Sequence, residues 1–458
     1  MSVADLFFDF MIVSLLLLLG TVLRRYVRFF QRYLIPNSLI AGFLGLFLGV
    51  ELLNLLPFDP VRMGAYVYHL LALTFISVGL FKTDQKHSSA AVNLGFMQVA
   101  VMLIQGIAGL GIAIMVMLTL VPDLNPAIGV LLPLGYSLGP GIAYSIGQSW
   151  SAYGFEAAGS FGLTFAAVGY LVAYFGGMLL INRSMGFGKP VEIRNHVRTG
   201  MRDVLNRPEG AKLSFSSAAV EPLAVHLALV GVVYLLTWML TRVLATALAS
   251  VGLASEVPIL WSFHFIIANL LALTIRRIVL RGSRGAWIDD GMMHRISGTF
   301  AEFLIVTSIM GISLTIAWRF ALPLLAICAV GAFLTYKFLL HACRAVFTRY
   351  RFERFVGIFA QMTGTISSGL ALLRVTDPEY RSPVAQELVL SSGIALGFGF
   401  PLLILINMPF SVFEGSDNGF VIVMGIMCLY LLILLVAWRA YFKRNPGVDA
   451  EPKPTTAP

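Results

Sequence analysis

Long apolar stretches recur along this chain and constrain its fold more than any other feature. A helix needs about 20 apolar residues to cross a bilayer core that is about 30 Å thick. Stretches of this order occur at Leu6–Leu23, Leu34–Leu56, Tyr66–Phe81, Ala90–Leu120, Ala157–Ile181, Leu223–Leu248, Val257–Ile275, Ile296–Trp318, Phe320–Leu340, Leu388–Met408 and Gly419–Trp438. We therefore predict an all-α polytopic membrane protein whose main partner is the lipid bilayer.

The composition of the 458 residues excludes an ordinary soluble protein. Only 12% of the residues are charged and 58% are hydrophobic, whereas soluble domains have about a quarter charged residues. The three cysteines have no short CxxC spacing, so we expect neither a disulfide framework nor a zinc site. We also expect no cofactor.

Two further apolar segments, Asn125–Trp150 and Phe355–Leu373, are interrupted by glycine, proline and hydroxyl residues. In hydrocarbon each unpaired backbone group costs several kcal/mol, so interrupted helices at membrane depth survive only where they line a cavity or are covered by protein. We predict that residues 125–150 and 355–373 are re-entrant hairpins, each of which enters and leaves on one face.

Basic residues give the expected orientation, because Lys and Arg gather in cytoplasmic loops. Arg24, Arg25, Arg28 and Arg32 follow the first span, which places the N-terminus outside and the C-terminus in the cytoplasm. With both hairpins re-entrant, nearly all of the 32 Lys and Arg residues lie in cytoplasmic segments. This topology explains the net charge of +9, and we expect no nucleic-acid partner.

The order of spans and hairpins predicts two inverted repeats of five spans, each with a re-entrant hairpin, plus one extra C-terminal span. Residues 1–182 form the first repeat and residues 220–410 the second. A cytoplasmic linker at 183–219 joins them, and the additional span at 411–440 precedes a disordered tail at 441–458. Ser137-Leu-Gly-Pro-Gly141-Ile-Ala143 aligns with Thr365-Ile-Ser-Ser-Gly369-Leu-Ala371. Inverted repeats with interrupted segments at corresponding positions are typical of secondary transporters, and those segments indicate the binding site.

At these residues the chain resembles the bacterial sodium/glutamate symporter family. The resemblance covers most of residues 1–410 and is carried by Arg32-Tyr-Leu-Ile-Pro36 with Ala41-Gly42, Phe75-Ile-Ser-Val-Gly79-Leu80, Gly139-Pro-Gly141 with Tyr153-Gly154-Phe155 and Gly176-Gly177, and Gly364 to Gly369. It implies a homodimer in the bacterial inner membrane that moves by an elevator-like mechanism. It also implies symport of Na⁺ with glutamate or a related small organic anion.

The resemblance and the two interrupted turns together give the candidate substrate-binding residues. They are Ser137, Gly139 and Gly141 in the first hairpin, Thr363, Gly364, Thr365, Ser367, Ser368 and Gly369 in the second, and Arg374 after it. A guanidinium pairs with a carboxylate in a bidentate manner, so Arg374 could clamp an anion. Its charge is also explained as a cytoplasmic marker.

The candidate ion-binding residues lie at equivalent places in the third and eighth spans. They are Thr74, Ser77, Thr307 and Ser308, together with Glu302. The hydroxyls could complete a sodium shell with hairpin carbonyls, or could bond their own helix backbone. A charge at a helix centre costs about 2.5 to 3.5 kcal/mol, so Glu302 should face the protein interior for cation or proton coupling, unless it is solvated near the surface or pairs with Arg295.

Proton-coupled transport and a channel are alternatives to sodium-coupled symport, and an enzyme is a third class to compare. Proton-coupled transport of another organic anion would use Glu302. A channel could also contain broken helices but needs no long linker between matched halves. An enzyme would need an acid/base pair, a nucleophile triad or a metal cluster, and the spans contain none in sequence, so we expect no enzymatic activity.

Overall fold

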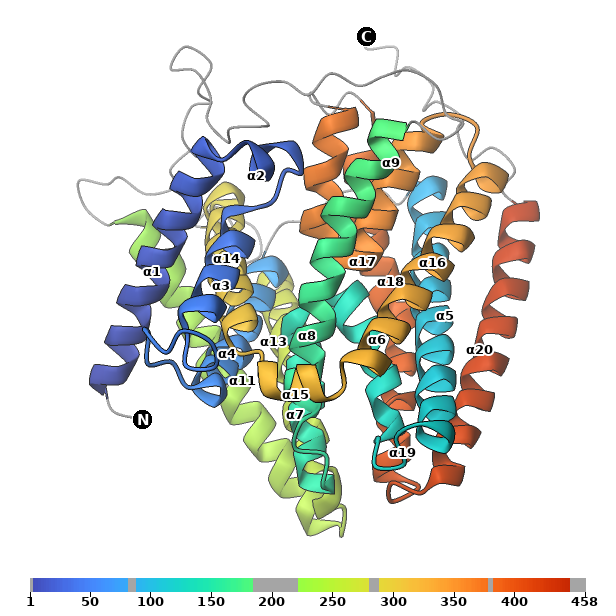
Figure 1. Ribbon diagram of the computed structural model, residues 1–458, viewed down its shortest axis with the longest axis horizontal. Coiled ribbons are helices and arrows are strands. Elements are labelled where there is room, and N and C mark those ends of the chain that lie inside the picture. Colours follow the sequence, from blue (N-terminus) through green and yellow to red (C-terminus); the bar gives the residue numbers. More distant parts are fainter. Residues whose placement is uncertain (1–2, 81–87, 184–220, 280–287, 378–381, 445–458) are drawn as a thin grey trace.

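The predicted fold class is confirmed at the level of an all-α, multi-span membrane protein. The computed structural model describes residues 3–80, 88–183, 221–279, 288–377 and 382–444, which fold into a bundle of helices (Figure 1). Within these ranges nine helices are long and apolar enough to cross a membrane by length and composition alone. One of them, Arg351–Thr376, is interrupted at Gly364 and Thr365 and folds back on itself. A further pair, which is bent by 63° near Phe263, makes a possible tenth span.

The helices follow one another along the chain with few long connections. They are α1 Val3–Tyr26, α2 Arg28–Arg32, α3 Asn37–Leu48, α4 Pro60–Gly79, α5 Ser89–Thr119, η1 Pro126–Val130, α6 Leu131–Pro133, η2 Leu134–Leu138, α7 Pro140–Ser149, η3 Trp150–Tyr153, α8 Ala158–Leu171, η4 Val172–Gly176, α9 Gly177–Arg183, α11 Pro222–Ser250, η6 Ala254–Glu256, α12 Val257–Ser262, α13 His264–Thr274, η7 Ile275–Val279, α14 Asp290–Met310, α15 Leu314–Arg319, α16 Ala321–Val346, α17 Arg351–Thr376, α18 Val384–Leu405, α19 Met408–Ser411 and α20 Asp417–Arg444.

Side-chain caps explain where several of these helices begin. The Asp59 side chain accepts a hydrogen bond from the backbone N–H of Val61, and Pro60 between them is the first residue of α4. Ser88 and Asp289 cap α5 and α14 in the same way. Such caps satisfy backbone donors that the first helical turn leaves without an intrahelical partner.

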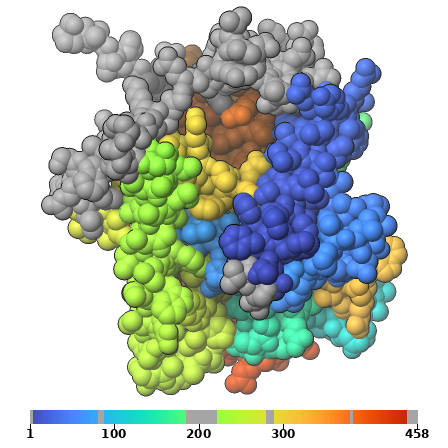
Figure 2. All heavy atoms as spheres, turned by 90° about the vertical axis from the view of Figure 1, so that its left-hand side faces the viewer, coloured from blue at the N-terminus to red at the C-terminus, as the bar shows by residue number. Residues whose placement is uncertain are grey.

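The helices form two groups that lie side by side (Figure 1). The first group contains α1, α3, α4, α11, α13 and α14, in which α4 packs against both α13 and α14. The second group contains α5, α8, α16, α17, α18 and α20, in which α5 packs against α16, α18 and α20. Figure 2 faces the first group and shows α4 and α14 between α1 and α11.

Two predicted spans differ from the observed helices. The stretch Leu34–Leu56 forms only α3, whose 12 residues advance about 18 Å. Pro36 precedes this helix, and Gly49 ends it in an extended conformation. The stretch Ile296–Trp318 is shifted, because α14 already begins at Asp290 and ends at Met310, so that Glu302 lies near the middle of its helix.

The extra C-terminal span corresponds to α20, which packs against α5. The indole N–H of Trp438 donates a 2.7 Å hydrogen bond to the buried Asn93 side chain at the start of α5. The helix continues to Arg444, so residues 441–444 belong to it. The predicted linker and the rest of the predicted tail lie outside the described residues, apart from Arg183 at the end of α9.

Candidate functional site

The segment between α5 and α8 reverses its direction at Gly139. Its first arm, 126–138, runs antiparallel to α5, because Gly129 packs against Gly109, Pro133 lies near Gly106, and the Ser137 hydroxyl reaches Gln105. The second arm, α7, runs antiparallel to α8, since Gly147 packs against Ala158 and Gly162 packs against Ala143. Both arms therefore point toward the end of the bundle where α5 ends and α8 begins (Figure 1). We call this the first fold-back segment.

The helix α17 also doubles back, although its 26 residues are helical on both sides of the turn. Gly364 and Thr365 have non-helical dihedral angles, and Gly369 packs against the carbonyl oxygen of Gly357 on the preceding arm. A straight helix would place residues 357 and 369 about 18 Å apart. We call α17 the second fold-back segment; its arms point toward the opposite end of the bundle, where α18 begins (Figure 1).

The turns of the two fold-back segments share a backbone conformation and meet each other. Gly139 has φ 93° and ψ 173°, and Thr365 has φ 72° and ψ 168°. A β carbon at Gly139 would lie 2.7 Å from Cγ2 of Thr365. The turn geometry therefore pairs Gly139 with Thr365 and Ser137 with Thr363. The alignment drawn from sequence alone paired Ser137 with Thr365, so the two pairings differ by two residues.

Gln105 on α5 connects both turns, and the sequence analysis did not identify it. The Ser137 hydroxyl donates to Oε1 of Gln105 at 2.8 Å. The amide nitrogen of Gln105 donates to the Thr335 hydroxyl at 2.9 Å and to the Met362 carbonyl at 3.0 Å. Gln105 is fully buried, so one side chain satisfies polar groups from α5, α16 and both fold-back segments.

We predict that Gln105→Met lowers transport by about tenfold or more. The substitution conserves volume but leaves the Ser137 and Thr335 hydroxyls without this partner, which costs about 1 to 3 kcal/mol, and a loss of 1.4 kcal/mol in the transition state is tenfold in rate. Initial uptake rates in proteoliposomes measure the effect.

Gln98→Met is the matched control for this prediction. Gln98 lies on the same helix, is also buried, and donates at 2.6 Å to the Ser391 hydroxyl on α18. We expect a similar loss of thermal stability with little loss of uptake rate. Equal losses of uptake in both variants would contradict a specific role of Gln105 at the turns.

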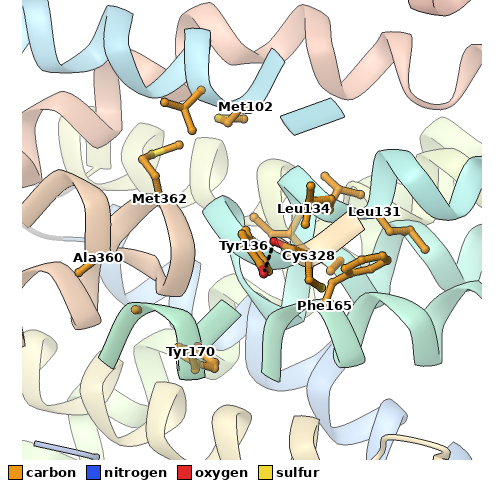
Figure 3. Packing of buried hydrophobic residues seen from close by; sticks show 14 of the residues in the cluster. Met102, Leu131, Leu134, Tyr136, Phe165, Tyr170, Cys328, Ala360 and Met362 are labelled. Atoms are coloured by element: carbon orange, nitrogen blue, oxygen red, sulfur yellow. Dashed lines mark hydrogen bonds between the residues drawn. The ribbon is translucent and has the colours of Figure 1, made fainter. Parts of the chain in front are cut away.

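Tyrosines from α8 and η4 line the second turn. The side chains of Tyr170 and Tyr174 lie close to Thr365 and Ser368, respectively. On the other side, the Tyr136 hydroxyl donates at 3.1 Å to the Cys328 carbonyl and anchors the first turn to α16 (Figure 3). Tyr174 belongs to the π-helical turn η4, and Tyr170 lies just before this turn. π-Helical turns are frequent at functional sites.

A buried acceptor lies on the first arm of the second fold-back segment. Gln361 donates through Nε2 to the Ser392 hydroxyl at 2.8 Å, but its buried Oε1 has no hydrogen-bond partner among the described residues. Leaving a buried acceptor without a partner costs about 1 to 3 kcal/mol. This oxygen is therefore available to a water molecule, a cation or a donor group of a ligand.

The substrate residues predicted from sequence occupy different positions around the turns. Ser137, Gly139 and Thr365 lie where the turns meet. Thr363 and Ser368 are buried and donate to carbonyls within α17, whereas Ser367 is exposed. Gly141 packs against Leu71 and Leu304 of the first helix group, Gly364 packs against Ala173, and Gly369 lies against Gly357.

Arg374 and Glu302 lie apart from the meeting point of the turns. Arg374 follows Thr365 by nine residues, about 14 Å along a helix, and is within electrostatic range of Arg24 on α1. Glu302 lies beside Ser38 and is close to Arg24 and Tyr174. These charged side chains form a polar region near Tyr174, between the two helix groups. The sequence analysis did not name Arg24 or Tyr174 as site residues.

The four hydroxyls proposed for ion binding all donate to their own helices. The acceptors are the carbonyls of Leu70 for Thr74, Leu73 for Ser77, Phe303 and Leu304 for Thr307, and Ile305 for Ser308. These bonds leave the hydroxyl lone pairs available. The structure brings α4 and α14 together at the second arm of the first fold-back segment, through Leu71 and Leu304.

Thr365→Gly is predicted to stabilise the protein and to impair transport. A β-branched residue at positive φ is a conformational outlier, and such strain costs about 1 to 3 kcal/mol. Glycine removes the strain, but it also removes the Thr365 methyl group that lies against Gly139 and the Thr365 hydroxyl that lies close to Tyr170. Thermal unfolding and uptake should move in opposite directions; a variant with unchanged uptake would exclude a role for the threonine side chain.

Comparisons of the chain with protein-family models, with curated proteins and with solved structures gave no match.

Proposed function

We propose that the chain consists of two inverted repeats, each with a re-entrant hairpin, and that it is a divergent relative of the sodium/glutamate symporters. The reversals at Gly139 and Thr365, which open toward opposite ends of the bundle, support this organisation. So do the packing partners: α3 packs on α14, and α13 packs on α4. In the order of the spans, the second packs on the eighth and the seventh packs on the third. The second and seventh spans are equivalent in the two repeats, as are the third and eighth, so the two packing pairs are related by the inversion.

We infer that the protein is a secondary active transporter, and one observation carries this conclusion. Two interrupted segments that enter from opposite ends of the bundle meet in its interior, where Gly139 lies against Thr365. Non-helical backbone at membrane depth is tolerated where it lines a cavity or is covered by protein, and paired interruptions mark transporter binding sites. The substrate binds at these turns, near Ser137, Thr365 and the second arm of α17.

An elevator-like movement fits the division into two helix groups. The fold-back segments belong to the second group, and they meet the first group mostly through small or apolar contacts. A buried hydrogen bond from the Ser145 hydroxyl of α7 to the Ser262 carbonyl of α12, at 2.8 Å, is an exception. Tyr144 of α7 packs directly against Gly64 of α4, and Leu71 and Leu304 pack against Gly141. Such apolar surfaces can slide, and the movement requires the hydrogen bond between Ser145 and Ser262 to break. In this proposal the first group is fixed, forms the homodimer contact and supports the moving second group.

Sodium is the proposed coupling ion, and glutamate or a related small organic anion is the proposed substrate. The test is uptake of labelled glutamate into proteoliposomes under an inward sodium gradient. Potassium in place of sodium and an ionophore that collapses the gradient are the controls. We expect accumulation that requires sodium. Absence of accumulation for glutamate and for a panel of related anions, by folded protein, would exclude this assignment.

Proton coupling through Glu302 is the alternative, because this carboxyl group lies near the middle of α14. We expect Glu302→Gln to leave the pH profile of uptake unchanged, since Glu302 lies apart from the meeting point of the turns, close to Ser38 and Arg24. The pH profile of initial rates, measured at saturating sodium for wild type and variant, decides between the two. Loss of a pH dependence present in the wild type would favour proton coupling.

A further inference from the structure

An apolar crevice separates the two helix groups beside α2, away from the turns. Its volume is about 370 Å³, within the range of ligand pockets of about 300 to 1,000 Å³. Its lining includes Leu23 and Phe30 near α2, Leu39, Ile40 and Phe43 from the α3 side, and Phe175 from η4. All lining residues are apolar, so a crevice of this kind suits a hydrocarbon chain.

Three cations gather at the head of this crevice. Arg25, Arg28 and Arg32 are exposed and lie at the end of α1 and on α2, at one end of the bundle (Figure 1). None of the three forms an ion pair with a described residue. The guanidinium groups of Arg25 and Arg32 lie over the neighbouring Tyr26 and Tyr33 rings, at 5.5 and 5.9 Å from the centroids.

The crevice extends from the arginines toward the membrane interior. Leu44 also lines it, and α3 advances about 8 Å from Leu39 to Leu44. The crevice therefore combines a cationic entrance at the membrane surface with an apolar interior at acyl-chain depth. Arginine clusters next to a membrane span attract anionic lipid head groups.

We propose that this crevice binds an anionic phospholipid, with the phosphate at Arg25, Arg28 and Arg32 and one acyl chain between α3 and η4. The far wall of the crevice is Phe175, which contacts Tyr33 at 4.6 Å between ring centroids. Phe175 directly follows Tyr174, which contacts Ser368. A lipid in this position therefore wedges the two helix groups next to the second turn.

Native mass spectrometry tests the proposal on the full-length protein in detergent, with phosphatidylglycerol and phosphatidylcholine as probes. We expect preferential retention of phosphatidylglycerol. Each cation near an anionic surface contributes about fivefold in affinity, so the triple variant Arg25→Gln, Arg28→Gln and Arg32→Gln should lose on the order of a hundredfold. The matched control substitutes glutamine for three cations near the end of α20, Arg439, Lys443 and Arg444. This variant should retain the lipid.

A second variant tests the acyl-chain part of the site. Leu44→Trp fills the crevice and should reduce phosphatidylglycerol retention with the three arginines intact. Leu18→Trp, at a position 67% exposed on α1, is its control, and thermal unfolding verifies folding of each variant. Unchanged retention in the triple arginine variant or in Leu44→Trp would overturn the proposal. Equal retention of phosphatidylcholine, or displacement of the lipid by inorganic phosphate, would also overturn it. Because lipid retention is measured without transport, its outcome is independent of the proposed function.

Discussion

Gly139→Ala is expected to reduce uptake by at least about tenfold while the protein remains folded in the membrane. Gly139 has φ 93° and ψ 173°, a region that is essentially restricted to glycine and costs other residues about 1 to 3 kcal/mol. The new β carbon would also lie 2.7 Å from Cγ2 of Thr365. The turns must then separate where we propose that the substrate binds. Initial uptake rates, normalised to reconstituted protein, measure the loss.

Gly154→Ala tests the effect of backbone strain at a positive φ without the contact between the two turns. Gly154 also has a positive φ, 86°, but a β carbon there would meet nothing within 4 Å. The substitution should therefore cost about 1 to 2 kcal/mol of stability and leave uptake largely intact. If the two alanine variants lose uptake equally, the contact between the turns is not the cause.

Glu387→Gln is expected to lower the free energy of unfolding by about 3 to 5 kcal/mol. Glu387 on α18 and Arg354 at the start of α17 form a bidentate, buried salt bridge with N–O distances of 2.8 and 2.9 Å. Glutamine removes the negative charge that pairs with the buried Arg354 guanidinium. The change should weaken the attachment of the first arm of the second fold-back segment to α18, and the midpoint of thermal unfolding in detergent measures it.

Two further variants test the physical cause of this loss. Glu414→Gln removes an exposed carboxylate between α19 and α20 and should leave the midpoint unchanged. The double variant Arg354→Met with Glu387→Leu should recover much of the stability, because apolar residues of similar volume often replace a buried ion pair at no cost. A double variant that is less stable than Glu387→Gln would show that the salt bridge is not the source of the destabilisation.

The spans were predictable because lipid imposes a length and an apolar composition on every crossing helix. The reversal points were indicated by the Gly139-Pro-Gly141 run and by the glycine and hydroxyl residues after Gln361. The length of α3 was not predictable from hydropathy. Its apolar sequence continues beyond Leu48, but Glu51 in the following loop turns to accept a hydrogen bond at 2.8 Å from the Ser313 hydroxyl, which precedes α15.

The contacts within the site were mostly beyond sequence reasoning. Gln105, Tyr170 and Tyr174 belong to ordinary spans, and only the fold brings them to the turns. Thr365 carries no sequence signal for a positive φ, since glycine is the residue expected there. The local alignment therefore matched Thr365 to Ser137, whereas the backbone conformation matches it to Gly139. Glu302 was recognised as costly in a span, but its proximity to Arg24 required the packing of α14 near α1.

Counterflow exchange in proteoliposomes tests the central claim most directly, namely that the meeting turns form the substrate site of a transporter. Vesicles loaded with unlabelled glutamate are diluted into a trace of labelled glutamate with equal sodium on both sides. We predict a transient accumulation of label above equilibrium, which Gly139→Ala abolishes and Gly154→Ala preserves. Entry of label that only approaches equilibrium, without this overshoot, would indicate a channel and would contradict the proposed alternating-access mechanism.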